Sequence, residues 1–138
     1  MNFENGTLKK IQSGAKAGNA TYDLQPPVGR RYKLLAASFT VTTDATVANR
    51  YFNFAFYDGA TLIGQIAPNS TAVTASQTKY TDATQYEVSN SAGAVRLGLI
   101  GVGDGWIVTN SIYTRFWLLN GVAGDSWQVD IIVSEIPE

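Results

Sequence analysis

Apolar and polar residues alternate through most of this chain, and the alternation has the period of an extended strand. The clearest case is the run RYFNFAFY, in which Phe52, Phe54 and Phe56 occupy every second position. Successive side chains of a strand point to opposite faces, so these rings are predicted to share one core. Asp58-Gly59 follows directly and is typical of a hairpin turn, because glycine accepts a positive φ.

The same pattern predicts further strands, whereas no 11-residue window has the sustained apolar spacing of an amphipathic helix. Besides 50–57, the expected strands lie at 7–11, 20–24, 30–43, 60–67, 95–100, 106–109, 111–119 and 127–136. The core-facing residues predicted in 30–43 and 127–136 are Leu35, Ala37, Phe39, Val41, Trp127, Val129, Ile131 and Val133. The strand at 111–119 is partly apolar on both faces, which indicates burial on both sides. We therefore predict an all-β fold, a single antiparallel β-sandwich or jelly-roll-like domain of about eight to ten strands.

Two segments depart from this pattern. Residues 1–19 combine glycines with Lys9, Lys10 and Lys16, which suits a flexible N-terminal arm ordered by a partner, so the sandwich domain is predicted at 20–138. Residues 68–94 are rich in Ser, Thr, Asn and Ala, with a possible strand at 84–88. So long a weakly patterned stretch favours a functional or partner-covered segment, with an exposed loop as the alternative.

The amino-acid composition argues against several common classes of catalytic and metal site. The 138 residues include no Cys and no His, which excludes a disulfide framework and a histidine-based triad and argues against a zinc enzyme. Charge is sparse at 15%, with 10 basic and 11 acidic residues. The densest basic spots, Lys9–Lys10 and Arg30–Arg31, are too small for a nucleic-acid footprint. No apolar run is long enough for a membrane helix, and the start of the chain lacks the pattern of a signal peptide.

The remaining motifs favour turns over catalysis. The sequence GVGDG lacks the Lys-Ser/Thr ending of a phosphate-binding loop. Asp44, Asp58, Asp104 and Asp125 all lie in predicted turns, where aspartate bonds to nearby backbone N–H groups. No D-x-D calcium pattern is present. We therefore expect no enzyme activity, no cofactor and no metal.

Aromatic residues offer two alternatives. A sugar-binding platform would need outward-facing rings; its candidates are Trp106, Trp117, Tyr51, Tyr57 and Tyr113. The favoured alternative is a core plus a subunit interface, where Tyr, Trp, Phe and Arg are enriched. The candidate partner-contact residues are Lys9, Lys10, Tyr80, Tyr86, Tyr113, Arg115 and Trp117.

Two stretches carry a family resemblance. The run PPVGRRYKLLAASFTVTTDATVANRYFNFAFYDG has a P-x-G-basic-basic-aromatic entry into a strand, then a polar turn and a second strand. WLLNGVAGDSWQVDIIVSEI has a G-D-x turn before the last strand. Together, over residues 26–67 and 116–136, they resemble small virion proteins of tailed bacteriophages, of the capsid decoration (cement) type.

The resemblance implies a β-sandwich protein that sits on the outer capsid shell and bridges capsid subunits. It further implies the major capsid protein and further copies of the chain as partners, with a trimer the expected homo-oligomer. Nucleic acid and membranes are not expected partners, and the expected location is the virion, assembled in the host cytoplasm. The alternative is a phage tail, baseplate or fibre module that binds host-surface glycan.

Overall fold

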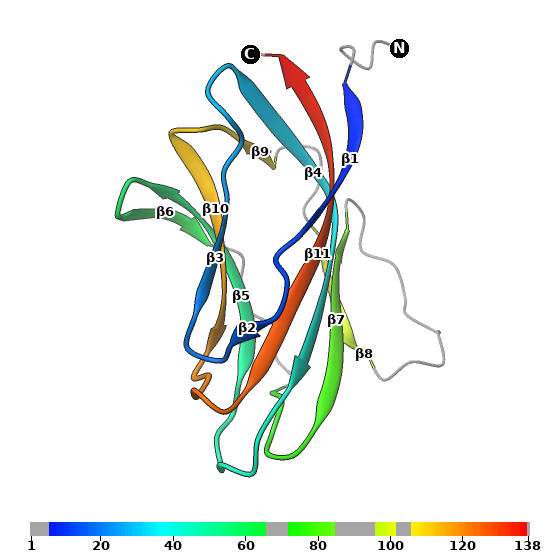
Figure 1. The fold of residues 1–138 in the computed structure, drawn as a ribbon, viewed down its shortest axis with the longest axis vertical. Coiled ribbons are helices and arrows are strands. Elements are labelled where there is room, and N and C mark those ends of the chain that lie inside the picture. The colour runs from blue at the N-terminus through cyan, green and yellow to red at the C-terminus, as the bar shows by residue number, and fades with distance from the viewer. Residues whose placement is uncertain (1–5, 66–71, 85–95, 102–105, 138) are drawn as a thin grey trace.

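Two β-sheets packed face to face make up the fold (Figure 1). The computed structural model describes residues 6–65, 72–84, 96–101 and 106–137. The large sheet has the strand order β1-β11-β4-β7-β8, with β2 paired to β11 and β9 paired to β4. The small sheet has the order β3-β10-β5-β6. All strand pairs are antiparallel except β7 with β8, and the described residues contain no helix. The predicted all-β sandwich is confirmed.

Eleven strands are formed by the described residues. Their bounds are Thr7–Gln12 (β1), Lys16–Ala17 (β2), Thr21–Leu24 (β3), Arg30–Thr42 (β4), Tyr51–Asp58 (β5), Thr61–Gln65 (β6), Thr78–Thr84 (β7), Arg96–Gly101 (β8), Ile107–Val108 (β9), Ile112–Leu119 (β10) and Ser126–Pro137 (β11). Nine of them overlap strands expected from the alternation. Strands β2 and β7 were not predicted, and the possible strand at 84–88 lies outside the described residues apart from its first position.

Strand β7 belongs to the stretch 68–94 that the sequence analysis treats as weakly patterned. It pairs with β4 over seven residues, so at least this part of the stretch is a strand of the large sheet. Its sequence TKYTDAT hides the pattern, because the core-facing position opposite Phe39 is a fully buried threonine, Thr81. Polar alternation of this kind leaves no apolar signal for a strand.

The expected N-terminal arm is part of the large sheet where the structure describes it. Strand β1 pairs with β11 over its whole length, from Thr7 opposite Glu135 to Gln12 opposite Asp130. Strand β2 also pairs with β11, and Ile11 packs against the core. The edge strand expected at 7–11 is therefore confirmed, but pairing within the domain already orders residues 7–12 and 16–17. Residues 1–5 lie outside the described part.

The phenylalanines of β5 lie in the core, as predicted. Phe52 and Phe54 are buried, and their rings lie 4.6 and 6.0 Å from that of Phe39 on the facing sheet. Phe56 is partly buried and stacks at 4.2 Å on Trp106. Such aromatic pairs are worth about 0.5–1.5 kcal/mol beyond the apolar area they bury.

A β-bulge in β4 overturns one predicted face. The pairing with β11 runs from Ala36 opposite Ile132 to Leu34 opposite Val133, so Leu35 is an extra, unpaired residue. The buried positions switch parity there, from Tyr32 and Leu34 to Ala37, Phe39 and Val41. The prediction that Leu35 faces the core is wrong: Leu34 is fully buried and Leu35 only partly.

Candidate functional site

The outer face of the small sheet gathers aromatic and arginine side chains from β5 and β10. Because Phe116 of β10 points into the core, its odd-numbered neighbours point outward. The antiparallel register sets Tyr113 opposite Tyr57. It also sets Trp117 opposite Asn53. We call the set on this side of the sheet the aromatic face: Tyr51, Tyr57, Tyr113, Arg115 and Trp117. Tyr113 is itself buried at 8% exposure.

Side-chain contacts hold this face in one arrangement. The Tyr57 ring stacks on Tyr113 at 6.0 Å and makes a T-shaped contact with Trp117 at 6.4 Å between ring centres. The Arg115 guanidinium carbon lies 4.7 Å from the centre of the Tyr57 ring, a cation–π distance. Two further bonds anchor that guanidinium, as its Nε and Nη2 donate to the two oxygens of Asp23 at 2.7 and 3.1 Å. A surface fixed in this way loses little side-chain entropy when it binds something.

The aromatic face carries no unbalanced charge at its centre. The hydrogen bonds from Arg115 to Asp23 raise the pKa of the guanidinium further above its ordinary value, so this group stays charged. The paired carboxylate offsets that charge. The Tyr113 hydroxyl donates to the carbonyl of Gly59 and accepts from Arg115 Nη2 at 3.3 Å, which connects the β5–β6 turn to the cluster.

A buried amide beside Trp117 is only half satisfied. Asn53 is 2% exposed, and its Oδ1 accepts a hydrogen bond from Gln65 Nε2 at 3.0 Å. Its Nδ2 has no hydrogen-bond partner. Leaving a buried donor without a partner costs about 1–3 kcal/mol. The sequence analysis missed Asn53, although a lone amide between Phe52 and Phe54 is a visible anomaly in the strand.

The three tryptophans have different roles. Trp106 and Trp127 are buried, and their indole N–H groups donate to Thr114 Oγ1 and the Ala17 carbonyl, both at 3.0 Å. Trp106 is therefore a core residue and not part of an outward platform. Trp117 is half-buried on the outer surface. Within the described part of the chain, its indole N–H has no hydrogen-bond partner.

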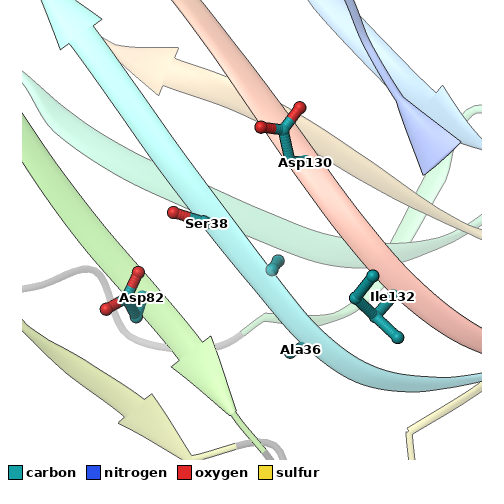
Figure 2. A pocket seen from close by; sticks show the side chains of 6 residues that line it. Ala36, Ser38, Asp82, Asp130 and Ile132 are labelled. Atoms are coloured by element: carbon teal, nitrogen blue, oxygen red, sulfur yellow. The ribbon is translucent and has the colours of Figure 1, made fainter. Parts of the chain in front are cut away.

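The outer face of the large sheet has a different character. Ala36 and Ser38 of β4 lie between Asp82 of β7 on one side and Asp130 and Ile132 of β11 on the other (Figure 2). With Ala37 these side chains line a shallow hollow of about 260 Å³. We call this surface the small-residue face and define it by the outward residues of β4 and β11: Ala36, Ser38, Thr40, Gln128, Asp130 and Ile132.

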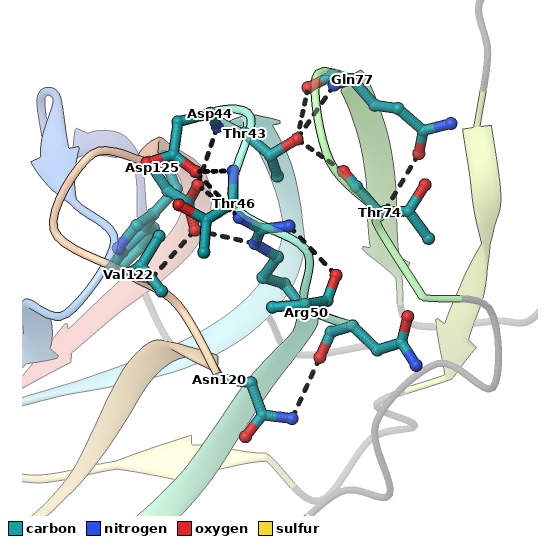
Figure 3. Close-up of polar contacts among 12 residues, drawn as sticks. Thr43, Asp44, Thr46, Arg50, Thr74, Gln77, Asn120, Val122 and Asp125 are labelled. Atoms are coloured by element: carbon teal, nitrogen blue, oxygen red, sulfur yellow. Dashed lines mark hydrogen bonds and ion pairs between the residues drawn. The ribbon is translucent and has the colours of Figure 1, made fainter.

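At one end of the sandwich, a buried arginine ties the loop before β5 to the loop before β11 (Figure 3). Arg50 is fully buried, and its Nε and Nη2 donate to the two carboxylate oxygens of Asp125 at 2.9 and 3.1 Å. Nη2 also donates to Asp44 Oδ1 at 3.1 Å, and Nη1 donates to the Ala48 carbonyl at 3.0 Å. We call these three ionised side chains the Arg50 clamp.

Backbone donors complete the Arg50 clamp. The N–H groups of Asp44 and Val122 donate to Asp125 at 2.9 and 3.0 Å. Burial opposes ionisation of Asp125, but the bonds from Val122, Arg50 and Asp44 outweigh it and lower the pKa of this carboxyl below its ordinary value. Asp44 and Asp125 are thus turn residues, as predicted, that also neutralise a buried cation. The arrangement is structural, because the partners of both carboxylates lie within the domain.

The remaining candidates fall at several places. Lys10 lies opposite Ile132 and Tyr80 opposite Thr40, so both border the small-residue face. Lys9 pairs with Glu135 at 3.3 Å on the β1 edge. Tyr86 and Asp104 lie outside the described residues. The structure therefore places Lys10 and Tyr80 at the small-residue face and Lys9 at the β1 edge, away from Tyr113, Arg115 and Trp117 on the opposite sheet, and does not bring these candidates into one site.

Among the described residues, no group of three or more Asp, Glu, His or Cys side chains could hold a metal ion. The same part of the chain has no helix of the length and apolarity needed to cross a membrane.

No protein-family model matches the chain, and no curated protein matches it.

Proposed function

We propose that this chain is a non-catalytic structural protein of a tailed-phage virion, a capsid decoration protein that binds the major capsid protein and bridges neighbouring subunits. The sequence resemblance at 26–67 and 116–136 supports the family. The observation that supports the docking mode is the small-residue face, a hollowed surface of short and mostly uncharged side chains. Lys10 and Tyr80, both candidate partner contacts, border it.

Short side chains make such a face well suited to repeated docking. Alanine, serine and threonine have few rotamers to lose on binding, so ordering this face costs less entropy than ordering long charged side chains. The hollow at Ala36 and Ser38 accepts a protruding side chain of the partner. Each contact is individually weak, and many copies on one shell add through multivalency.

Self-association completes the proposal. A trimer fits local threefold positions of an icosahedral shell, where one decoration unit contacts three capsid subunits at once. The native mass of the purified chain tests this element: a trimer supports it, and a monomer at all concentrations contradicts it.

The copy number of the protein in purified virions tests the function. Quantitative mass spectrometry against the major capsid protein is expected to give hundreds of copies per particle. A handful of copies would instead place the chain in the tail, baseplate or fibre and favour the alternative, a module that binds host-surface glycan. No copies at all would overturn the virion assignment.

A matched pair of variants tests the docking face. Ser38→Arg fills the hollow with a side chain that Asp82 and Asp130 can pair with, so the fold should tolerate it while docking is blocked. Thr61→Arg adds the same side chain at an exposed position of the small sheet. We expect Ser38→Arg to lose co-sedimentation with undecorated capsids and Thr61→Arg to keep it. Equal binding by both variants would remove this face from the proposal.

A further inference from the structure

We propose that the aromatic face is a binding site for a neutral glycan, with a pyranose ring stacked on Trp117 and a sugar hydroxyl accepting a hydrogen bond from Asn53 Nδ2. This site lies on the sheet opposite to the small-residue face. It goes beyond the proposed attachment to the capsid and holds wherever in the virion the chain sits.

Trp117 and Asn53 form a cross-strand pair. These residues lie directly opposite each other on β10 and β5. In the described part of the chain, neither side-chain N–H group has a hydrogen-bond partner, and Asn53 is only 2% exposed. The buried, unpaired Asn53 donor calls for a ligand that carries hydrogen-bond acceptors. Sugar hydroxyls are such acceptors, and the apolar face of a pyranose packs on an indole ring.

Access to Asn53 runs past Gln65. This side chain is exposed on the edge strand β6 and donates to Asn53 Oδ1 at 3.0 Å. Because Gln65 is held by that one side-chain bond, its rotation opens the amide and offers a second hydrogen-bonding group to the same sugar. A site that combines the flat Trp117 indole with the neighbouring amides of Asn53 and Gln65 suits a hydroxylated sugar ring better than an aliphatic ligand.

The charge of the site selects a neutral ligand. Arg115 is the cation of this face, and Asp23 accepts two hydrogen bonds from it. An acidic sugar would have to compete with a bidentate carboxylate already in place. Tyr57, held between the contacts with Tyr113 and Arg115, supports the indole edge, so the stacking surface is set before the ligand arrives.

Titration of the full-length purified protein tests the site. Cellotriose, maltotriose and chitotriose serve as neutral probes and sialyllactose as the acidic comparator, with binding measured by calorimetry and by ligand NMR at millimolar concentration. We expect at least one neutral trisaccharide to bind and sialyllactose to bind more weakly. Trp117→Ala should reduce the affinity at least about tenfold, and Trp117→Phe, which keeps a ring but removes the N–H, by less.

Asn53→Ala should also weaken binding, and Tyr80→Ala, an aromatic truncation on the large sheet, should leave it unchanged. Melting curves of each variant separate lost binding from lost folding, and Trp117→Phe remains informative if Asn53→Ala does not fold. Failure of every neutral probe to bind overturns the proposal, as does undiminished binding by folded Trp117→Ala. Burial of Trp117 against a second copy in solution, shown by loss of its exposure on oligomerisation, would also overturn it. Capsid co-sedimentation is a separate readout, so either proposal can fail alone.

Discussion

At the scale of single residues, Arg50 shows how a charge can lie fully inside this domain. Removing an arginine from water is costly unless its charge is neutralised and its donors are used. Here the Nε, Nη1 and Nη2 atoms all donate, and Asp125 and Asp44 supply the opposite charge. Asp125 has four hydrogen-bond contacts in turn, two of them from backbone N–H groups. The Arg50 clamp is therefore satisfied from both sides.

Removing one member should be far more costly here than at a surface ion pair. We expect Arg50→Met to lower the free energy of unfolding by about 3–5 kcal/mol, because Asp125 is left charged and buried. Arg115→Met is the matched control, since its bidentate pair with Asp23 has side chains 29% and 34% exposed, against 0% for both Arg50 and Asp125. That control should cost about 1 kcal/mol. Urea unfolding of both variants measures the difference, and equal losses would contradict the account.

Acid should weaken the Arg50 clamp through Asp125. Its pKa is lower in the folded protein than the ordinary value of about 3.9 in the unfolded chain, so the unfolded state binds the proton more readily. The stabilisation is then complete above that ordinary value and is lost as the pH falls through the folded value. We expect the free energy of unfolding to fall as the pH drops below that ordinary value. Asp125→Asn should flatten this fall; a profile identical to that of the unaltered protein would exclude Asp125 as the cause.

At the scale of elements, alternation identified most strands because one face of each packs on the core. Phe52 and Phe54 of β5 follow that rule, as do Trp127, Val129, Ile131 and Val133 of β11. The bulge at Leu35 could not be predicted, because Leu34 and Leu35 are both leucines and either parity fits the sequence. Strand β7 was hidden by its buried Thr81. The pairing of β4 with β11 determines which leucine is buried, and the pairing of β7 with β4 determines that Thr81 faces the core. Neither pairing can be deduced from the sequence of one strand.

The bulge makes a direct prediction for the two adjacent leucines. Leu34→Ala should destabilise the protein by about 2–5 kcal/mol, because it opens a cavity at a fully buried position. Leu35→Ala removes the same atoms from a partly exposed bulge residue and should cost about 1 kcal/mol or less. Chemical denaturation of the pair measures the ordering. A larger loss at Leu35 would show that the face assigned by the sequence pattern is the correct one.

The candidate site was predictable in part for a similar reason. Tyr113, Arg115 and Trp117 stood out because aromatic residues and arginine alternate with core residues in 111–119. Their outward orientation depended on Phe116 facing the core, which the pattern allowed but did not decide. Asn53, Gln65 and Asp23 come from three other strands, and only the sheet order β3-β10-β5-β6 brings them beside the aromatic face. The same is true of the Arg50 clamp, whose partners are 75 residues apart.

At the scale of the whole molecule, β1 closes one edge of the large sheet. Deleting residues 1–12 removes its six-residue pairing with β11 and the contact of Ile11 with the core. We expect a lower melting temperature and concentration-dependent association, since the freed edge of β11 can pair with another chain. Calorimetry and size-exclusion chromatography measure both effects. An unchanged melting temperature would mean that the segment is a dispensable arm, as the composition of residues 1–19 first indicated.

The two outer faces of the sandwich are proposed to bind different partners, the capsid on one side and a glycan on the other. If the small-residue face docks on the capsid, the aromatic face of the opposite sheet is turned away from the shell and remains accessible. A column bearing the neutral trisaccharide that binds the free protein should then retain capsids decorated with this protein. Undecorated capsids should pass through the column. Decoration with Trp117→Ala should remove retention without reducing the copy number, whereas Ser38→Arg should reduce the copy number itself. If capsids decorated with the unaltered protein also pass through the column, the aromatic face is the one that docks on the capsid.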